Sequence, residues 1–121
     1  MKRDYLRLGF DIDGTILKED SSFESTEEID DCSSYINCLH QEGHKITLFT
    51  SRPWSMFEKT REQLYKINLK YDVLIMGKPS FDFLIDDRNI EFEGRWNDEF
   101  ITTLSNKIKK RMDEPRWAKE F

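Results

Sequence analysis

Short apolar runs recur along this chain and are separated by longer amphipathic stretches. Alternating apolar residues predict a strand over residues 5–10 that ends at Asp11. Three nearly continuous apolar stretches predict further strands, because runs of this length suit buried strands: residues 45–50, 73–76 and 83–85. The pattern therefore predicts four strands, each followed by polar residues.

The segment between the first two predicted strands has the period of a helix. Ser25-Thr26-Glu27-Glu28 is a capping box, and the apolar residues after it recur every three or four positions. We therefore predict a helix over about residues 26–42, ended by Gly43, which suits the residue after a helix. His40 and His44 are interpreted as solvent-facing residues at this helix end.

Two more helices complete the pattern. Pro53 suits the first turn of a helix that keeps its apolar period to about Asn68. Asn97 predicts the cap of a final helix, which must finish before Pro115. Strands that alternate with helices predict an α/β fold, a Rossmann-like three-layer α/β/α sandwich with a mainly parallel sheet.

Length and composition narrow the class of protein. At 121 residues the chain is predicted to be a single domain, residues 1–121. Its aromatic content of 13% supplies large groups to bury and argues against disorder. A net charge of −5 disfavours a long nucleic acid as partner, although a local patch could override it. No apolar run approaches a membrane span and the N-terminus does not resemble a signal peptide, so a cytoplasmic protein without membrane contact is expected.

Polar residues suited to phosphate chemistry follow every predicted strand. The first strand ends in Asp11-Ile12-Asp13-Gly14, the second in Thr50-Ser51-Arg52, the third leads to Lys78, and Asp86-Asp87 follows the fourth. The carboxyl ends of parallel strands meet at one edge of a sheet, so these groups are expected to converge there. Clustered carboxylates require a cation, for which Mg²⁺ is the usual choice. The alternative interpretation is a set of solvated turn residues, since Asp and Gly are common in turns.

The sequence Asp11-Ile-Asp-Gly-Thr-Ile16 resembles the first motif of the haloacid dehalogenase-like superfamily, most of whose members are magnesium-dependent phosphohydrolases. Thr50, Lys78 and Asp86-Asp87 resemble its second, third and fourth motifs, in the same order along the chain. The resemblance covers about residues 6–88. It implies a phosphatase, that is, a phosphoric monoester hydrolase that acts through an aspartyl-phosphate.

The resemblance also implies roles for individual residues. Asp11 resembles the nucleophile that becomes aspartyl-phosphate, and Asp13 resembles the general acid that later serves as base for the hydrolytic water. The predicted substrate-binding residues are Thr50, Ser51, Arg52 and Lys78. Thr50 and Lys78 resemble the phosphate-holding pair of the family. Arg52 is favoured as a substrate contact over a plain surface charge because the sequence Thr50-Ser51-Arg52 places it beside the phosphate site.

The metal implied by the resemblance is Mg²⁺. Its ligands would be the Asp11 carboxylate, the main-chain carbonyl of Asp13, and Asp86. Asp87 would orient Lys78 or a metal-bound water, although the two neighbouring acids could exchange roles.

Many members of the superfamily carry a cap domain, and none fits here. One helix fills nearly half of the interval between Asp13 and Thr50, which leaves residues 17–25 for a short flap. A site without a cap must take its specificity from loop residues, for which Trp54 and Arg88 are candidates, from a large substrate, or from a neighbouring subunit of a homo-oligomer.

In its small size and in the residues of its motifs, the chain most resembles the capless phosphatases of bacterial capsule and surface-polysaccharide synthesis. That resemblance implies a phosphosugar or another small phosphorylated metabolite as substrate. Ile85-Asp-Asp-Arg88 also resembles polynucleotide 3′-phosphatases and deoxynucleotidases, so a nucleotide phosphate is the alternative. A catalytically idle domain that binds phosphate or a partner is the third possibility, and the four intact motifs argue against it.

Overall fold

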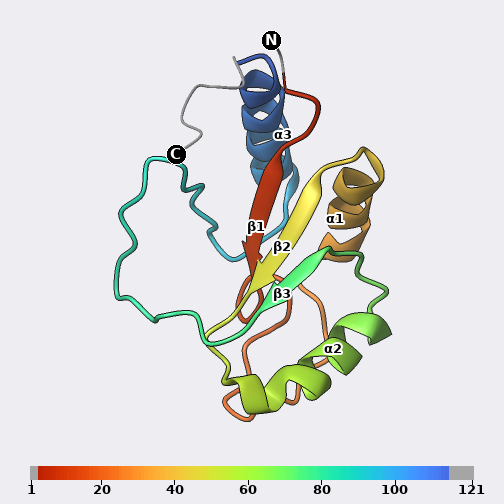
Figure 1. Cartoon of the computed structure of the whole chain (residues 1–121), viewed down its shortest axis with the longest axis vertical. Helices are drawn as coiled ribbons and strands as arrows, with labels where there is room; N and C mark the ends of the chain where they lie inside the picture. Colours follow the sequence, from red (N-terminus) through yellow and green to blue (C-terminus); the bar gives the residue numbers. More distant parts are fainter. Residues whose placement is uncertain (1–2, 115–121) are drawn as a thin grey trace.

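Strands and helices alternate along the chain in the computed structural model, which describes residues 3–114. The strands are β1 (Arg7–Asp11), β2 (Lys45–Phe49) and β3 (Val73–Ile75), and the helices are α1 (Cys32–Gln41), α2 (Phe57–Lys66) and α3 (Asp98–Met112). A short 3-10 turn, Trp54–Met56, leads into α2. Figure 1 shows α2 beyond the ends toward which the strands point.

The three strands form one parallel sheet in the order β1-β2-β3. Leu8 lies opposite Ile46, so apolar residues of neighbouring strands share one face. This face packs with apolar residues of α1 and α3 into one core, and Tyr35 of α1 is hydrogen-bonded to Ser105 of α3 at 2.7 Å. The predicted α/β class with a parallel, Rossmann-like arrangement is confirmed.

The predicted start of the first helix is wrong. α1 begins at Cys32 rather than near residue 26, because the capping-box segment pairs with the chain that follows β1. The Ile29 N–H donates to the carbonyl of Ile16 at 2.8 Å. Asp30 and Asp31 then take left-handed conformations, with φ of 52° and 56°, through which a right-handed helix cannot continue.

The two later helices match their predictions more closely. Pro53 precedes the 3-10 turn, and α2 ends at Lys66, two residues short of Asn68. The Asn97 side chain caps α3, since its Oδ1 accepts a hydrogen bond from the Phe100 N–H at 2.9 Å. Within residues 3–114, no helix has the length and apolar character that crossing a membrane requires.

His44 is buried, which corrects its interpretation as a solvent-facing residue. Gly43, at φ 101°, turns the chain from α1 back toward the sheet. The His44 side chain is 5% exposed, and its Nδ1 accepts a hydrogen bond from the Leu6 N–H at 3.0 Å. The ring therefore packs inside the fold beside the start of β1.

No fourth strand forms among the described residues, so the strand predicted over residues 83–85 is wrong. Every residue from 79 to 91 is exposed, and this segment, called the arc below, loops away from the sheet. Phe83 and Ile85 are 86% and 97% exposed. Gly77, at φ 72°, turns the chain out of line after β3, and Asp86 closes a local turn by accepting from the Arg88 N–H at 2.9 Å. Three apolar residues between charged neighbours do not hold the segment on the sheet.

Candidate active site

A tight turn follows β1 and sets two carboxylates in the wall of one hollow. Asp11 ends the strand, Asp13 follows it, and the Gly14 N–H donates to the carbonyl of Leu17 at 2.8 Å. Gly14 has φ 83°, and a Cβ added there would lie 2.9 Å from a carboxylate oxygen of Glu19. A residue with a side chain would therefore be strained and crowded, so the turn requires glycine.

The hollow beside this turn has a volume of about 610 Å³ and lies at the carboxyl end of the sheet. Its lining residues are Asp11, Asp13, Glu19, Asp20, Ser21, Phe23, Ser51, Lys78, Ser80 and Phe81. The hollow thus brings together four of the residues that the sequence indicated, namely Asp11, Asp13, Ser51 and Lys78.

Asp11 and Lys78 face each other across this hollow. Lys78 Nζ lies 3.3 Å from Asp11 Oδ1 and 4.4 Å from the centre of the Phe49 ring. Burial raises the pKa of the Asp11 carboxyl above its usual value, and the positive charge of Lys78 opposes that rise only in part. A perturbed carboxyl beside a single cation in a hollow is typical of a reactive group.

The main chain fixes the position of Lys78. Its N–H donates to the carbonyl of Thr50 at 2.8 Å, and the Gly77 N–H donates to the carbonyl of Arg52 at 2.8 Å. Two hydrogen bonds therefore tie the chain after β3 to the chain after β2. This local pairing places the lysine at the hollow although the segment beyond it leaves the sheet.

Asp13 is held on both of its oxygens. Arg52 donates from Nη2 to Oδ1 at 2.7 Å and from Nε to Oδ2 at 3.0 Å, while the Thr50 hydroxyl lies 3.3 Å from Oδ2. The bidentate geometry fixes the plane of the carboxylate as well as its place. Asp13 therefore has a defined orientation at the edge of the hollow.

Arg52 lies behind Asp13 rather than in the lining of the hollow. Its side chain is 1% exposed, and its Nη1 donates to Thr60 Oγ1 at 3.0 Å and to Gln63 Oε1 at 2.5 Å, both on α2. Thr50 is likewise 1% exposed. Of the predicted substrate-binding residues, Ser51 and Lys78 line the hollow, while Thr50 and Arg52 support it from behind.

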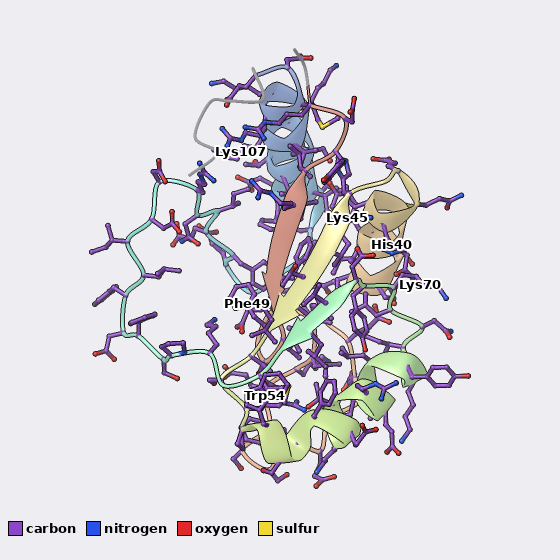
Figure 2. All side chains as sticks on the ribbon, viewed as in Figure 1. His40, Lys45, Phe49, Trp54, Lys70 and Lys107 are labelled. Carbon is purple, nitrogen blue, oxygen red and sulfur yellow. The ribbon has the colours of Figure 1, made fainter. Side chains whose placement is uncertain are left out.

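Asp86 is not brought to the hollow, because it lies on the arc. Figure 2 shows the side chains of this segment standing apart from the sheet. Among residues 3–114, no group of three or more His, Cys, Asp or Glu side chains is arranged to hold a metal ion.

The oxygen donors at the hollow nevertheless fit a hard cation in part. Asp11 is 37% exposed and supplies a carboxylate, and the resemblance to the superfamily adds the main-chain carbonyl of Asp13 as a second ligand. Both carboxylate oxygens of Asp13 are engaged by Arg52. Mg²⁺ keeps several waters and often binds through one or two carboxylates together with substrate phosphate, so these donors suit it.

Sequence reasoning missed the residues that complete the site from the loop and from α2. Glu19, Asp20 and Phe23 line the hollow, but the sequence assigned their segment only to a short flap. Gln63 is 3% exposed. The available sequence signal for it was an amide side chain three residues after Thr60, on the face of the helix that the apolar period predicts to be buried. Trp54, a candidate for specificity, is 60% exposed and packs against Phe57, with ring centres 5.7 Å apart, at the start of α2 (Figure 2).

Comparisons with known proteins agree with this architecture. Residues 8–76 match the family model described as haloacid dehalogenase-like hydrolase. The chain is also similar to the crystal structure of a target protein from Vibrio cholerae, with 27% sequence identity and a TM-score of 0.59 over 84% of this chain and 97% of that one. No curated protein matches the chain significantly. The family match spans β1 to β3 and includes the first turn and Thr50, and it ends just before Lys78.

Proposed function

The chain belongs to the haloacid dehalogenase-like hydrolase family, and from this premise we propose that it hydrolyses phosphomonoesters through an aspartyl-phosphate on Asp11. The observation that carries the proposal is the meeting of Asp11 with Lys78 at 3.3 Å in a hollow that Asp13 also lines. A nucleophilic carboxylate, a cation for the transferring group and a proton-transfer group are the parts that this reaction needs.

The first half of the proposed reaction moves the phosphoryl group to the protein. An Asp11 carboxylate oxygen attacks phosphorus and the bond between phosphorus and the ester oxygen breaks. Asp13, which must be in its protonated form for this half, gives its proton to that oxygen, which leaves as an alcohol. Lys78 offsets the negative charge of the group in transfer. The main chain around Lys78 is held by Thr50, so the ammonium needs little reorganisation to do this.

The second half releases phosphate. A water molecule attacks phosphorus of the aspartyl-phosphate, and Asp13, now ionised, takes the proton of that water. The bond between phosphorus and the Asp11 oxygen breaks, which releases inorganic phosphate and restores the carboxylate. Asp13 can serve both halves because it sits at the edge of the hollow, 18% exposed, with a fixed orientation.

We propose that the Asp11 carboxylate, the main-chain carbonyl of Asp13 and the Asp86 carboxylate would hold Mg²⁺. The ion would supply positive charge for the phosphoryl oxygens. Asp86 carries the weakest support of these ligands, since it lies outside the hollow in the structure.

The lining of the hollow favours a small hydroxylated monophosphate. Glu19 and Asp20 line the hollow from the loop after β1 and supply acceptors for hydroxyl groups. The same carboxylates repel further phosphates, which disfavours a polynucleotide. We therefore propose a phosphosugar or a similar phosphorylated metabolite as substrate.

Steady-state hydrolysis of p-nitrophenyl phosphate with Mg²⁺ tests the reaction. The substitution Asp11→Asn removes the nucleophile, and we expect a loss on the order of a thousandfold or more. Asp82→Asn, the same change at an exposed position on the arc, is the matched control and should keep the wild-type rate. Chelation should stop turnover and added Mg²⁺ should restore it.

Activity that survives Asp11→Asn, or that persists fully in chelator, contradicts the proposed mechanism. A panel of a sugar phosphate, a nucleoside monophosphate and a 3′-phosphorylated oligonucleotide then tests the substrate class. Preference for the sugar phosphate supports the proposal, and preference for either nucleotide overturns the substrate assignment. Silence of the wild type across the panel and toward the aryl phosphate supports an idle phosphate-binding domain instead.

A further inference from the structure

Arg52 is a buried cation, and each of its three guanidinium nitrogens donates at least one hydrogen bond to the protein. It makes two hydrogen bonds to Asp13 and one each to Thr60 and Gln63, and the ring of Phe23 lies 4.9 Å from its Cζ. Burying a charge is costly unless it is paired and hydrogen-bonded. The buried cation lies directly behind Asp13, and rotation of the Asp13 carboxylate would break the two charged hydrogen bonds between them.

Gln63 connects this buried cation to the loop that lines the hollow. Its Oε1 accepts from Arg52, while its Nε2 donates to the carbonyl of Phe23 at 2.7 Å and to the carbonyl of Ser25 at 3.2 Å. Thr60 and Gln63 are three residues apart on α2, so they present to Arg52 from one face of the helix. One amide side chain therefore bonds both the cation and the loop.

The loop has little else to fix it at this point. Phe23 has φ 56°, an uncommon conformation for a residue with a side chain, and needs its surroundings to hold it there. Its N–H donates to the Asp20 carbonyl at 2.9 Å, a contact inside the loop itself. The contacts that reach the body of the fold are the Gln63 amide, the packing of the Phe23 ring on Arg52, and an ion pair between Glu24 and Lys59 of α2 that is partly open to solvent.

We propose that Arg52 is a positioning residue that orients Asp13, and that Gln63 couples this orientation to the loop of residues 19–25. Settling substrate against the loop and aligning Asp13 are then one event rather than two. The part that concerns Asp13 in proton transfer rests on the proposed function. The coupling between Asp13 and the loop does not.

The geometry favours this role over direct contact of Arg52 with substrate. The guanidinium is 1% exposed and is absent from the lining of the hollow. To reach a phosphate it would have to abandon Asp13, Thr60 and Gln63, and leave three polar groups without their partner.

Kinetics with two substrates tests the positioning role. Arg52→Lys keeps the charge and loses the bidentate fork, and Thr60→Val removes one acceptor at nearly constant volume. With glucose 6-phosphate, a poor leaving group, kcat of Arg52→Lys should fall about tenfold to a hundredfold, while KM stays within about twofold. With p-nitrophenyl phosphate, whose leaving group needs no proton, release of p-nitrophenol in the first turnover should slow by less than about threefold. Thr60→Val should show the same pattern at smaller size, and Thr60→Ser, which restores the hydroxyl, should return to the wild-type values.

Other kinetic outcomes overturn the positioning role. A raised KM with unchanged kcat in Arg52→Lys means that the residue binds substrate directly. Equal losses with both substrates in the release of the leaving group mean that Arg52 does not act through the proton that Asp13 gives to it. If Arg52→Lys fails to fold, the Thr60 pair alone decides between these outcomes, because each member changes a single hydroxyl or methyl group.

Hydrogen exchange tests the coupling without any activity. Gln63→Glu keeps an acceptor for Arg52 and loses the amide that donates to the loop, while Asp13→Asn weakens the grip of Arg52 on the other side. Both should raise amide exchange in residues 20–25 roughly fivefold or more, with the β2 amides as an internal reference. If Asp13→Asn leaves the loop at its wild-type exchange rate, no coupling exists. A wild type that hydrolyses neither substrate defeats the proposed function, and the exchange result still decides the coupling.

Discussion

Two regions flank Asp11, and they differ in how their polar and apolar groups are satisfied. On one side Asp13, Thr50 and Arg52 form a hydrogen-bonded cluster in which Arg52 is 1% exposed. On the other side the arc leaves Ile85 97% exposed, and it runs clear of the sheet in Figure 1. Both regions were expected to deliver site residues from strand ends, but one is a buried hydrogen-bonded cluster and the other leaves its apolar side chains in water.

The anchoring of the arc explains how the two regions can share one site. Its first end is fixed by the Lys78 N–H on the Thr50 carbonyl. Its far end is fixed by the carboxylate of Asp30. Asp30 Oδ2 accepts hydrogen bonds from Arg95 Nε at 2.7 Å and from the Trp96 N–H at 2.9 Å. Between these points the arc borders a second hollow along β1, whose outer edge has no neighbouring strand among the described residues. The anchored half of the site is therefore built before substrate arrives, whereas Asp86 is not.

The same substitution in both regions should give the largest contrast. Ile46→Ala removes a fully buried side chain of β2 and should lower the free energy of unfolding by about 2–5 kcal/mol. Ile85→Ala on the arc should change it by no more than about 0.5 kcal/mol, because that side chain is already in water. Urea unfolding followed by circular dichroism measures both.

The control for this contrast is the position itself, since the two variants lose the same atoms. A cost above about 1 kcal/mol for Ile85→Ala would mean that the arc packs against the body of the fold in solution. The open edge of β1 is the place where a fourth strand would then lie, and Asp86 would come nearer to Asp11. A negligible change in the free energy of unfolding for Ile85→Ala would agree with the exposed position of the arc in the structure.

A substitution of Trp96, at the far anchor of the arc, should change the free energy of unfolding by a smaller amount. Its indole N–H donates to the Thr15 carbonyl at 2.7 Å, and its ring packs near Phe92 and Phe100, with centres 5.7 and 5.2 Å apart. Trp96→Phe keeps an aromatic ring but leaves the carbonyl without its donor, so unfolding should cost about 1–3 kcal/mol less. The same measurement applies.

Trp54→Phe is the matched control for Trp96→Phe. Trp54 is 60% exposed, so its replacement should lie within about 0.5 kcal/mol of wild type. Equal costs at the two positions would show that loss of the ring area, rather than loss of the anchor, sets the effect. Faster amide exchange across residues 79–91 in Trp96→Phe alone would show that the anchor restrains the arc.

The elements that sequence could predict are those whose signal lies within them. The alternating run before Asp11 and the periodic segment after Asn97 gave β1 and α3 nearly in place. The start of α1 could not be predicted from its capping box, because Ile29 pairs with Ile16, which lies outside the helix. The apolar run at residues 83–85 looked like a strand, and its placement depended on a long-range partner that no local pattern specifies.

The site divides in the same way. Asp11 and Asp13 could be predicted together because residues two apart leave a strand on one side. Arg52 was expected at the substrate, since its position beside Thr50 is all that the sequence shows. Its burial depends on Thr60 and Gln63 a helix away, and this placement turns an expected contact into a support.

His44 gives the smallest expected effect, and it acts only on the anchored region. Burial lowers the pKa of His44 below its usual 6.5, and the nearby charge of Glu42, 3.8 Å away, opposes this only in part. As the pH falls, His44 therefore takes up a proton in the unfolded chain at a higher pH than in the folded protein. Its contribution to the free energy of unfolding is fully present above pH 6.5 and is lost as the pH falls below that value. Protonation of Nδ1 also removes the acceptor of the Leu6 N–H.

Urea unfolding at several pH values tests this contribution. The urea concentration at the midpoint should decrease as the pH is lowered from 7 to 5. His44→Asn keeps an acceptor without a titrating group and should make this decrease smaller. Exchange of the arc amides, corrected for the intrinsic effect of pH, should not follow the midpoint, because the arc is not packed on β1. If it does follow, the two regions unfold as one unit and the contrast between them is lost.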